Sequence, residues 1–197
     1  MDLQARASRI RFLLLDVDGV LTNGKILIDA DGEESKQFDI KDGTALVWAQ
    51  RSGLGVALLS ARMSAATAHR AAQLGIASVH QGVSSKLEAY DRILSEHGLN
   101  DADVAYMGDD LLDLPVIVRV GLSAAPADAA GEVKTRVHCV TRASGGGGAV
   151  RELVELLLKA QGRWASLLAS YAGDQSTGRV TSARESTKGG RGRRRTG

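Results

Sequence analysis

Short apolar segments alternate with helical patterns along most of this chain, and this alternation limits the possible folds most strongly. Buried strands that alternate with helices of this length form a parallel sheet whose two faces are covered by helices. We therefore expect a Rossmann-like, doubly wound α/β fold. The expected strands are 12–17, 56–59, 76–79, 104–107, 120–124 and 137–140, and the expected helices are 43–51, 64–73, 85–97, 111–119 and 149–161.

Two segments depart from this alternation. Residues 24–38 contain two extended runs around Asp31 and Gly32, which predict a β-hairpin that projects from the body. From residue 174 onward, the low hydrophobicity and the Gly, Ser, Thr and Arg content predict a disordered basic tail. A chain of 197 residues with 44% hydrophobic content can bury one sizeable core, so we expect residues 1–173 to form a single domain.

The net charge of +2 conceals an asymmetry between the body and the tail. Residues 176–197 carry seven Lys or Arg and one Glu, so the remaining 175 residues carry a net charge of −4. An acidic body argues against a nucleic-acid-binding domain. For the tail, disorder without a specific role and weak nonspecific contact with nucleic acid remain alternatives.

The single cysteine, Cys139, excludes an internal disulfide and a cysteine-based metal cluster, and it fits a reducing compartment. We expect it to act as a small buried apolar side chain. No apolar stretch reaches the roughly 18 residues that a membrane helix needs, and the amino terminus lacks the apolar core of a signal peptide. We therefore expect a soluble cytoplasmic protein without membrane contact.

Carboxylates follow two of the expected strands. Asp16 and Asp18 end the first, and Asp109, Asp110 and Asp113 follow the strand at 104–107. Ligand sites in open α/β sheets lie beyond the carboxyl ends of the strands, so these acids should converge, which is costly unless a cation neutralises them. Hard oxygen ligands without His or Cys favour Mg²⁺. The alternative is that these acids are only turn residues or helix caps. That explanation is sufficient for a single Asp, but it accounts less well for two clusters after two separate strands.

Polar side chains also follow the neighbouring strands. Ser60 and Arg62 come directly after the strand at 56–59, and Lys86 lies in the first turn of the helix expected at 85–97. A cation there opposes the helix dipole by about 0.3–1 kcal/mol, which indicates a functional reason; the alternative is an ordinary solvated lysine. Carboxylate, metal, hydroxyl and ammonium together suit phosphoryl transfer.

These residues resemble the four ordered motifs of the haloacid dehalogenase-like phosphatases: DVDGV from Asp16, Ser60 after an apolar strand, Lys86, and GDD from Gly108. The longer stretches DVDGVLTNG, FDIKDG, LLSAR, VAYMGDDLLDLP and GGGGAVREL are similar to the capless 3-deoxy-D-manno-octulosonate 8-phosphate phosphatase family. The similarity runs from about residue 12 to residue 164.

The resemblance implies a role for each site residue. Asp16 would be the nucleophile that forms an aspartyl phosphate, and Asp18 the general acid and later the base. Mg²⁺ would be held by Asp16, Asp109 and the backbone carbonyl of Asp18, with Asp110 and Asp113 nearby, while Ser60 and Lys86 would hold the phosphoryl oxygens. Substrate contacts are implied for Asp18, Asp39, Ile40, Lys41, Asp42, Gly43, Arg62, Arg70 and Lys86.

The implied activity is Mg²⁺-dependent hydrolysis of 3-deoxy-D-manno-octulosonate 8-phosphate, a step toward lipopolysaccharide. One alternative is a phosphatase for a nine-carbon nonulosonate or sialic acid 9-phosphate. The other is a scaffolding module that has lost catalysis, against which the retained Asp16, Asp18, Ser60, Lys86 and Asp109 argue.

The spacing of the motifs leaves no room for a cap domain. Only 43 residues separate Asp16 from Ser60, and 25 separate Ser60 from Lys86. An open site weakens electrostatic catalysis, so we expect the hairpin of a neighbouring subunit to cover it. The resemblance implies a homotetramer; the alternative is an uncovered site that accepts large phosphorylated substrates.

Four consecutive glycines, 145–148, precede the last expected helix. Such a run predicts a mobile loop. In the resembling family, a larger residue, commonly Arg, stands where this chain has Gly147, so a substrate contact from this loop is left open.

Overall fold

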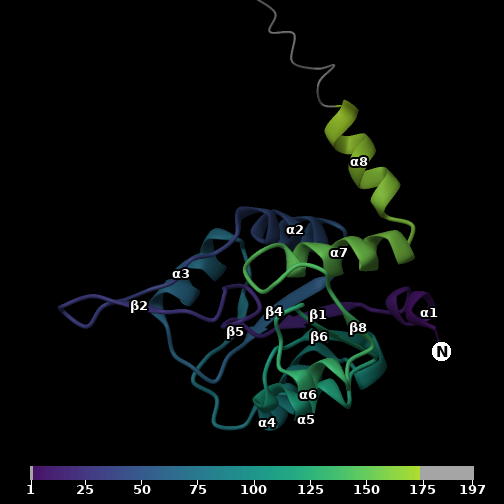
Figure 1. Cartoon of the computed structure of the whole chain (residues 1–197). Helices are drawn as coiled ribbons and strands as arrows, with labels where there is room; N and C mark the ends of the chain where they lie inside the picture. Colours follow the sequence, from purple (N-terminus) through teal and green to yellow (C-terminus); the bar gives the residue numbers. More distant parts are fainter. Residues whose placement is uncertain (1, 174–197) are drawn as a thin grey trace, which may run out of the picture.

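The computed structural model describes residues 2–173, and it has the expected doubly wound α/β architecture (Figure 1). The predicted disorder and nucleic-acid contact of the basic tail at 174–197 lie outside the described residues. The elements are α1 (Leu3–Ala7), β1 (Phe12–Leu15), β2 (Leu27–Ile28), β3 (Glu34–Ser35), α2 (Ile40–Arg51), β4 (Gly55–Leu59), α3 (Ala65–Gln73), β5 (Ser78–His80), α4 (Lys86–His97), η1 (Asp101–Asp103), β6 (Val104–Met107), η2 (Leu111–Asp113), α5 (Leu114–Ile117), β7 (Leu122–Ala125), α6 (Gly131–Lys134), β8 (Cys139–Val140), α7 (Ala149–Ala160) and α8 (Trp164–Gly173).

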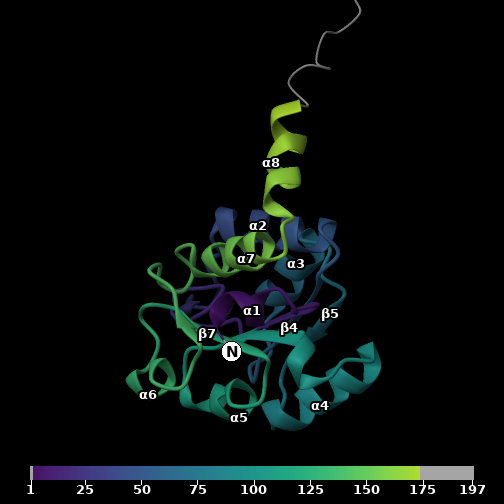
Figure 2. The same ribbon diagram turned by 90° about the vertical axis from the view of Figure 1, so that its right-hand side faces the viewer.

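The main sheet has six parallel strands in the order β5-β4-β1-β6-β7-β8. Helices α2, α3 and α7 cover one face, and α4, α5 and α6 cover the other (Figures 1 and 2). Strand β1 lies in the middle and is buried throughout, since its alternate side chains face opposite layers. Leu13 and Leu15 pack in the core under α2 and α7, whereas Phe12 and Leu14 pack in the core with α4 and α5.

The strand order places a switch point between β1 and β6. The chain passes from β1 to β4 and β5 on one side and then returns to place β6, β7 and β8 on the other. The loops that leave β1 and β6 therefore diverge, and a crevice opens beyond the carboxyl ends of these two strands. Asp16 and Asp109 follow these strand ends.

Local sequence signals explain where several helices begin and end. The Ser85 side chain accepts a hydrogen bond from the backbone N–H of Glu88 at the start of α4, and Gly98 ends this helix with a φ of 60°. Helix α2 begins three residues earlier than expected, at Ile40, because the Asp39 carboxylate caps it by accepting from the N–H groups of Lys41 and Asp42.

Some expected elements are shorter or shifted. Strand β5 begins at Ser78 rather than residue 76, because Ile76 still donates its N–H to Ala71 at the end of α3. The helix expected at 111–119 is a 3₁₀ turn followed by the short α5. The helices α1, α6 and α8 were not expected. Helices α1 and α6 have only about one turn each, so their formation depends on tertiary packing more than on a sequence pattern.

The hairpin expected near residues 24–38 is present as β2 and β3, which pair antiparallel and project from the body (Figure 1). The Asp29 carboxylate stabilises its turn by accepting from the N–H groups of Asp31 and Glu33, and Gly32 adopts a φ of 83°. Within residues 2–173 there is no cap domain between the motifs, as the spacing predicted. No helix in the described part of the chain is long and apolar enough to cross a membrane.

Two further features concern the carboxyl-terminal part. Helix α8 extends away from the body (Figure 2). Trp164 at its start packs edge-on against Trp48, and Trp48 Nε1 donates a hydrogen bond to the Tyr171 hydroxyl, near the end of α8, at 2.8 Å.

Cys139 in β8 is half-buried rather than fully buried, and it packs against the core. Burial raises the pKa of its thiol to about 11, so the group is protonated near neutral pH.

Candidate active site

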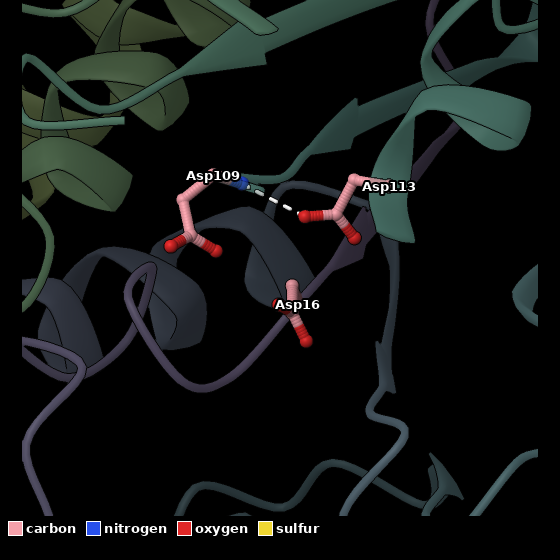
Figure 3. A group of neighbouring side chains, drawn as sticks. All are labelled: Asp16, Asp109 and Asp113. Carbon is pink, nitrogen blue, oxygen red and sulfur yellow. Dashed lines mark hydrogen bonds between the residues drawn. The ribbon is translucent and has the colours of Figure 1, made fainter. Parts of the chain in front are cut away.

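Two carboxylates meet at the switch point. Asp16 directly follows β1, where its N–H continues the sheet by donating to Met107 O, and Asp109 lies two residues beyond β6. One carboxylate oxygen from each of Asp16, Asp109 and Asp113 lies within 4.8 Å of the others (Figure 3). The two acidic clusters therefore converge at one edge of the sheet, as the sequence indicated.

Burial perturbs these acids strongly. It raises the pKa of Asp16 to about 6, although the Lys86 charge opposes the shift. Burial and the charges of Asp16 and Asp113 raise the pKa of Asp109 to about 7. A divalent cation between Asp16 and Asp109 would remove this repulsion, and carboxylate oxygens are the ligands that hard cations prefer. The donor set therefore fits Mg²⁺.

The glycine of the DVDG motif has a structural reason. Gly19 has a φ of 87°, and a Cβ at this position would collide with the carboxylate of Asp109. The loop after β1 and the loop after β6 approach each other closely at this point. A side chain at Gly19 would therefore displace the Asp109 carboxylate.

Lys86 completes the buried charge cluster. Its ammonium lies 3.0 Å from Asp16 Oδ1 and 2.5 Å from Asp113 Oδ1, and its side chain is 5% exposed. Burial alone would lower the pKa of Lys86, but the charges of Asp16 and Asp113 outweigh it and raise the pKa. The lysine that opposes the dipole of α4 is therefore stabilised by two carboxylates from outside that helix.

Asp113 organises the site around it. Its Oδ1 accepts from Lys86 and from the hydroxyl of Tyr106 at 2.6 Å, while its Oδ2 accepts from the N–H groups of Asp109 and Asp110. With four donors on its two oxygens, Asp113 holds its neighbours in place. The sequence analysis missed Tyr106. This residue lies inside β6 and not after its end, so its position in the sequence did not indicate that its hydroxyl reaches the site.

Ser60 and Asp110 lie at the edges of the cluster. Ser60 follows β4, is buried, and accepts a hydrogen bond from the N–H of Arg62 at 3.2 Å through its hydroxyl oxygen. Asp110 is exposed, and its carboxylate accepts from the N–H of Leu111 at the start of η2. Both line the same cleft.

The hairpin reaches the site from the other side. Lys36 Nζ donates to both carboxylate oxygens of Asp18, at 2.6 and 2.8 Å. Glu34 pairs with Arg62, whose Nη2 lies 2.7 Å from Glu34 Oε2. The sequence analysis did not identify Lys36 or Glu34. Only the tertiary fold brings the base of the hairpin close to Asp18, which follows β1, and to Arg62, which follows β4.

A cleft of about 260 Å³ opens at this edge of the sheet. The catalytic and metal-ligating candidates all line it, and Arg62 is the candidate substrate residue that lines it in addition to Asp18 and Lys86. The lining residues are Asp16, Asp18, Gly24, Ser60, Ala61, Arg62, Lys86, Asp109, Asp110, Leu112 and Asp113.

The other candidate substrate residues lie outside this cleft. Asp39 caps α2, while Ile40 and Lys41 are exposed on its first turn. The guanidinium of Arg70 donates to Asp39 O at 3.4 Å, and Gly43 permits this approach, since a Cβ there would collide with Arg70.

Asp42 is 1% exposed, and its carboxylate accepts from the N–H groups of Gly148 and Arg151 at the start of α7. It therefore caps a helix that is distant in sequence.

The glycine run before α7 packs closely against the loop after β1. A Cβ at Gly145 would collide with Gly19 O, and one at Gly146 would lie 2.6 Å from the backbone of Thr22. Gly146 also donates its N–H to Val20 O. The first two glycines therefore have a packing role that the expectation of a mobile loop did not include.

Comparisons with known proteins agree on the family. The model of the haloacid dehalogenase-like hydrolase family matches residues 66–153. The 3-deoxy-D-manno-octulosonate 8-phosphate phosphatase KdsC of Escherichia coli K12 is 46% identical over 162 residues, which are 82% of this chain and 86% of that protein.

Solved structures show the same fold. A probable YrbI family phosphatase from Pseudomonas syringae pv. phaseolica has a TM-score of 0.85 and 44% identity, and the match covers 87% of this chain and 97% of that one. The 3-deoxy-D-manno-octulosonate 8-phosphate phosphatase of Moraxella catarrhalis, solved with a magnesium ion, a phosphate ion and a KDO molecule, has a TM-score of 0.84 and 34% identity, with coverage of 85% and 97%. The identity and coverage of these matches establish that the chain belongs to the KdsC family of 3-deoxy-D-manno-octulosonate 8-phosphate phosphatases, within the haloacid dehalogenase-like hydrolases.

Proposed function

We propose that this protein is a Mg²⁺-dependent phosphatase that hydrolyses 3-deoxy-D-manno-octulosonate 8-phosphate to the free sugar acid and phosphate, a step toward lipopolysaccharide. One observation carries the proposal: Asp16, Asp109 and Lys86 meet at one cleft at the switch point of the sheet. The activity of the relatives and the contents of the Moraxella catarrhalis structure support it.

The buried acids supply the metal ligands in this proposal. Asp16, Asp109 and the backbone carbonyl of Asp18 would hold Mg²⁺, and Asp113 would hold the backbone of Asp109 in place through its hydrogen bond at 2.9 Å. When bound, the ion neutralises the carboxylates and the phosphoryl oxygens, so that the anionic substrate can approach an anionic nucleophile.

The first half-reaction transfers the phosphoryl group to the protein. The Asp16 carboxylate attacks phosphorus, the bond between phosphorus and the sugar oxygen breaks, and Asp18 gives its proton to that oxygen. Lys86 and Ser60 bind the equatorial oxygens, where charge must be stabilised during transfer. The product on the protein is an aspartyl phosphate at Asp16.

The second half-reaction restores Asp16. Asp18, now deprotonated, takes a proton from water, the resulting nucleophile attacks phosphorus, and the Asp16 oxygen leaves. Because only Val17 separates the two carboxylates on the strand-end loop, Asp18 can serve both steps. Lys86 keeps the leaving Asp16 carboxylate paired.

We also propose the homotetramer. Exposed apolar side chains occur on the hairpin at Ile26, Leu27 and Ile28, and close to the cleft at Met63 and Leu112. An association between copies of the chain through these side chains would bury them and cover the cleft. Light scattering at micromolar concentration tests this: a fully active monomer would contradict it.

We also propose a cytoplasmic location, which the free thiol of Cys139 supports. Cell fractionation tests it.

The activity is tested by phosphate release from 3-deoxy-D-manno-octulosonate 8-phosphate and from a nonulosonate 9-phosphate, with and without Mg²⁺. We expect Mg²⁺-dependent turnover that is faster on the eight-carbon substrate. Asp16→Asn should lose turnover and keep its fold, because an amide is not a nucleophile. Faster turnover of the nine-carbon substrate would replace the proposed substrate, and inactivity on both would indicate a noncatalytic protein.

A further inference from the structure

Lys36 is a buried lysine that the mechanism above does not use. Its side chain is 1% exposed, and its ammonium donates to both oxygens of Asp18. Lysines are rarely buried to this extent unless they are paired. The contact joins the hairpin to the residue that carries the proton in the proposed reaction.

Glu34 and Arg62 extend the contact into a ring of alternating charge. Glu34 Oε1 lies 3.6 Å from Lys36 Nζ, and its Oε2 lies 2.7 Å from Arg62 Nη2. Arg62 Nε in turn lies 3.6 Å from Asp18 Oδ2. The Lys36 contacts to Asp18 are about 1 Å shorter than the Arg62 contact, so Lys36 is the partner that fixes the Asp18 carboxylate.

We propose that Lys36 is a positioning residue for Asp18, an inference that rests on the proposed function. Two short charge-assisted hydrogen bonds to the two oxygens of one carboxylate restrict rotation of that group. Without Lys36, the nearest remaining cation is Arg62, and the Asp18 carboxylate would turn toward it. The reacting proton would then no longer face the sugar oxygen.

The step that Lys36 serves is the departure of the leaving group. As Asp16 bonds to phosphorus and the bond from phosphorus to the sugar oxygen breaks, the proton of Asp18 moves to that oxygen. Lys36 neither gives nor takes a proton; its ammonium spans both oxygens of Asp18 and so fixes the plane of that carboxyl group relative to the substrate. Its effect should therefore depend on how much the leaving group needs a proton.

The experiment compares two substrates with Lys36→Met, which keeps the length of the side chain and removes the charge. The sugar phosphate has an alkoxide leaving group that needs a proton, whereas 4-nitrophenyl phosphate releases a stable phenolate. The readout is kcat/KM, which covers the steps up to the departure of the leaving group. We expect kcat/KM to fall about 10- to 100-fold on the sugar phosphate, which is a partial loss of the roughly 100- to 10,000-fold that general acid catalysis contributes. On 4-nitrophenyl phosphate it should change little.

Two further variants separate positioning from structure. Lys36→Arg keeps the charge and should retain more activity on the sugar phosphate than Lys36→Met. In an Asp18→Asn background, Lys36→Met should lower kcat/KM on the sugar phosphate little further, because the carboxyl group that Lys36 positions is already lost. Lys25→Met, an exposed lysine on the same hairpin, is the matched control and should behave as the unsubstituted protein.

Distinct results would overturn the inference. Equal losses on both substrates would mean that Lys36 only supports the fold, and an increase in KM with unchanged kcat would mean that it binds the sugar acid. Either result leaves the proposed function intact. If the unsubstituted protein does not hydrolyse the sugar phosphate, the proposed function fails and the role of Lys36 fails with it.

Discussion

Lys86 Nζ lies 3.0 Å from Asp16 Oδ1 and is held there by Asp113, which lies on a different loop. The ammonium belongs to the first turn of α4, where the helix dipole opposes a cation. The carboxylates of Asp16 and Asp113, which follow the strands on the two sides of the switch point, offset that cost. The arrangement keeps a positive charge beside the expected nucleophile before any substrate binds.

We predict that Tyr106→Phe raises KM for the sugar phosphate. The substitution removes the hydroxyl that donates to Asp113 Oδ1 at 2.6 Å, so Asp113 and Lys86 lose part of their support. The free energy of unfolding should fall by about 1 kcal/mol, a typical value for one hydrogen bond. Steady-state kinetics and urea unfolding measure the two effects.

Tyr90→Phe is the matched control, since Tyr90 is also buried and donates its hydroxyl to Asp101 at 2.9 Å. It should lower stability by a similar amount and leave KM unchanged. A higher KM in both variants would show that general loosening, and not the support of Lys86, is responsible.

Asp109→Asn should stabilise the metal-free protein at alkaline pH. Burial raises the pKa of Asp109 from 3.8 to about 7, so between these values the folded state binds more protons than the unfolded state. This contribution to stability is complete below about pH 4 and is lost as the pH rises through about 7. In EDTA above pH 7, the variant should therefore melt at a higher temperature than the unsubstituted protein.

Magnesium should reverse this order, because it stabilises the folded state only where the ligands are intact. Asp31→Asn, on the exposed turn of the hairpin, is the control for removing one negative charge. If both substitutions raise the melting temperature equally, net charge and not local repulsion is the cause.

Gly19→Ala should weaken Mg²⁺ binding. Its φ of 87° makes any Cβ unfavourable by about 1–2 kcal/mol, and its methyl group would displace the Asp109 carboxylate. Isothermal titration calorimetry measures the affinity. Gly32→Ala provides a close control, because Gly32 has a φ of 83° and nothing within 4 Å of an added Cβ, so it should lose stability and keep its metal affinity.

Asp42→Ala should lower stability and leave KM unchanged. The carboxylate accepts from the N–H groups of Gly148 and Arg151, and a lost helix cap costs about 0.5–2 kcal/mol. Asp39→Ala, which removes the cap of α2, gives the scale for such a loss. An increase in KM for Asp42→Ala would instead support the substrate contact that the family resemblance implies.

The sequence predicted the fold class and the catalytic edge because both follow from local patterns. Continuous apolar runs such as 12–15 are typical of strands in a sheet that is covered on both faces, and residues directly after parallel strands share one edge. Asp16, Ser60, Lys86 and Asp109 were therefore placed together by chain position alone.

Only the tertiary structure decided which partner each of these groups has. Lys36 and Asp18 are 18 residues apart and Tyr106 and Lys86 are 20 apart, with no periodic pattern linking them. The family resemblance implies a substrate contact for Asp42, and only the tertiary structure shows that its carboxylate also caps a helix more than 100 residues away. Local patterns determine which segments form strands and helices and at which edge of the sheet a residue lies. The contacts of a polar side chain depend in addition on how loops from distant strands pack against one another.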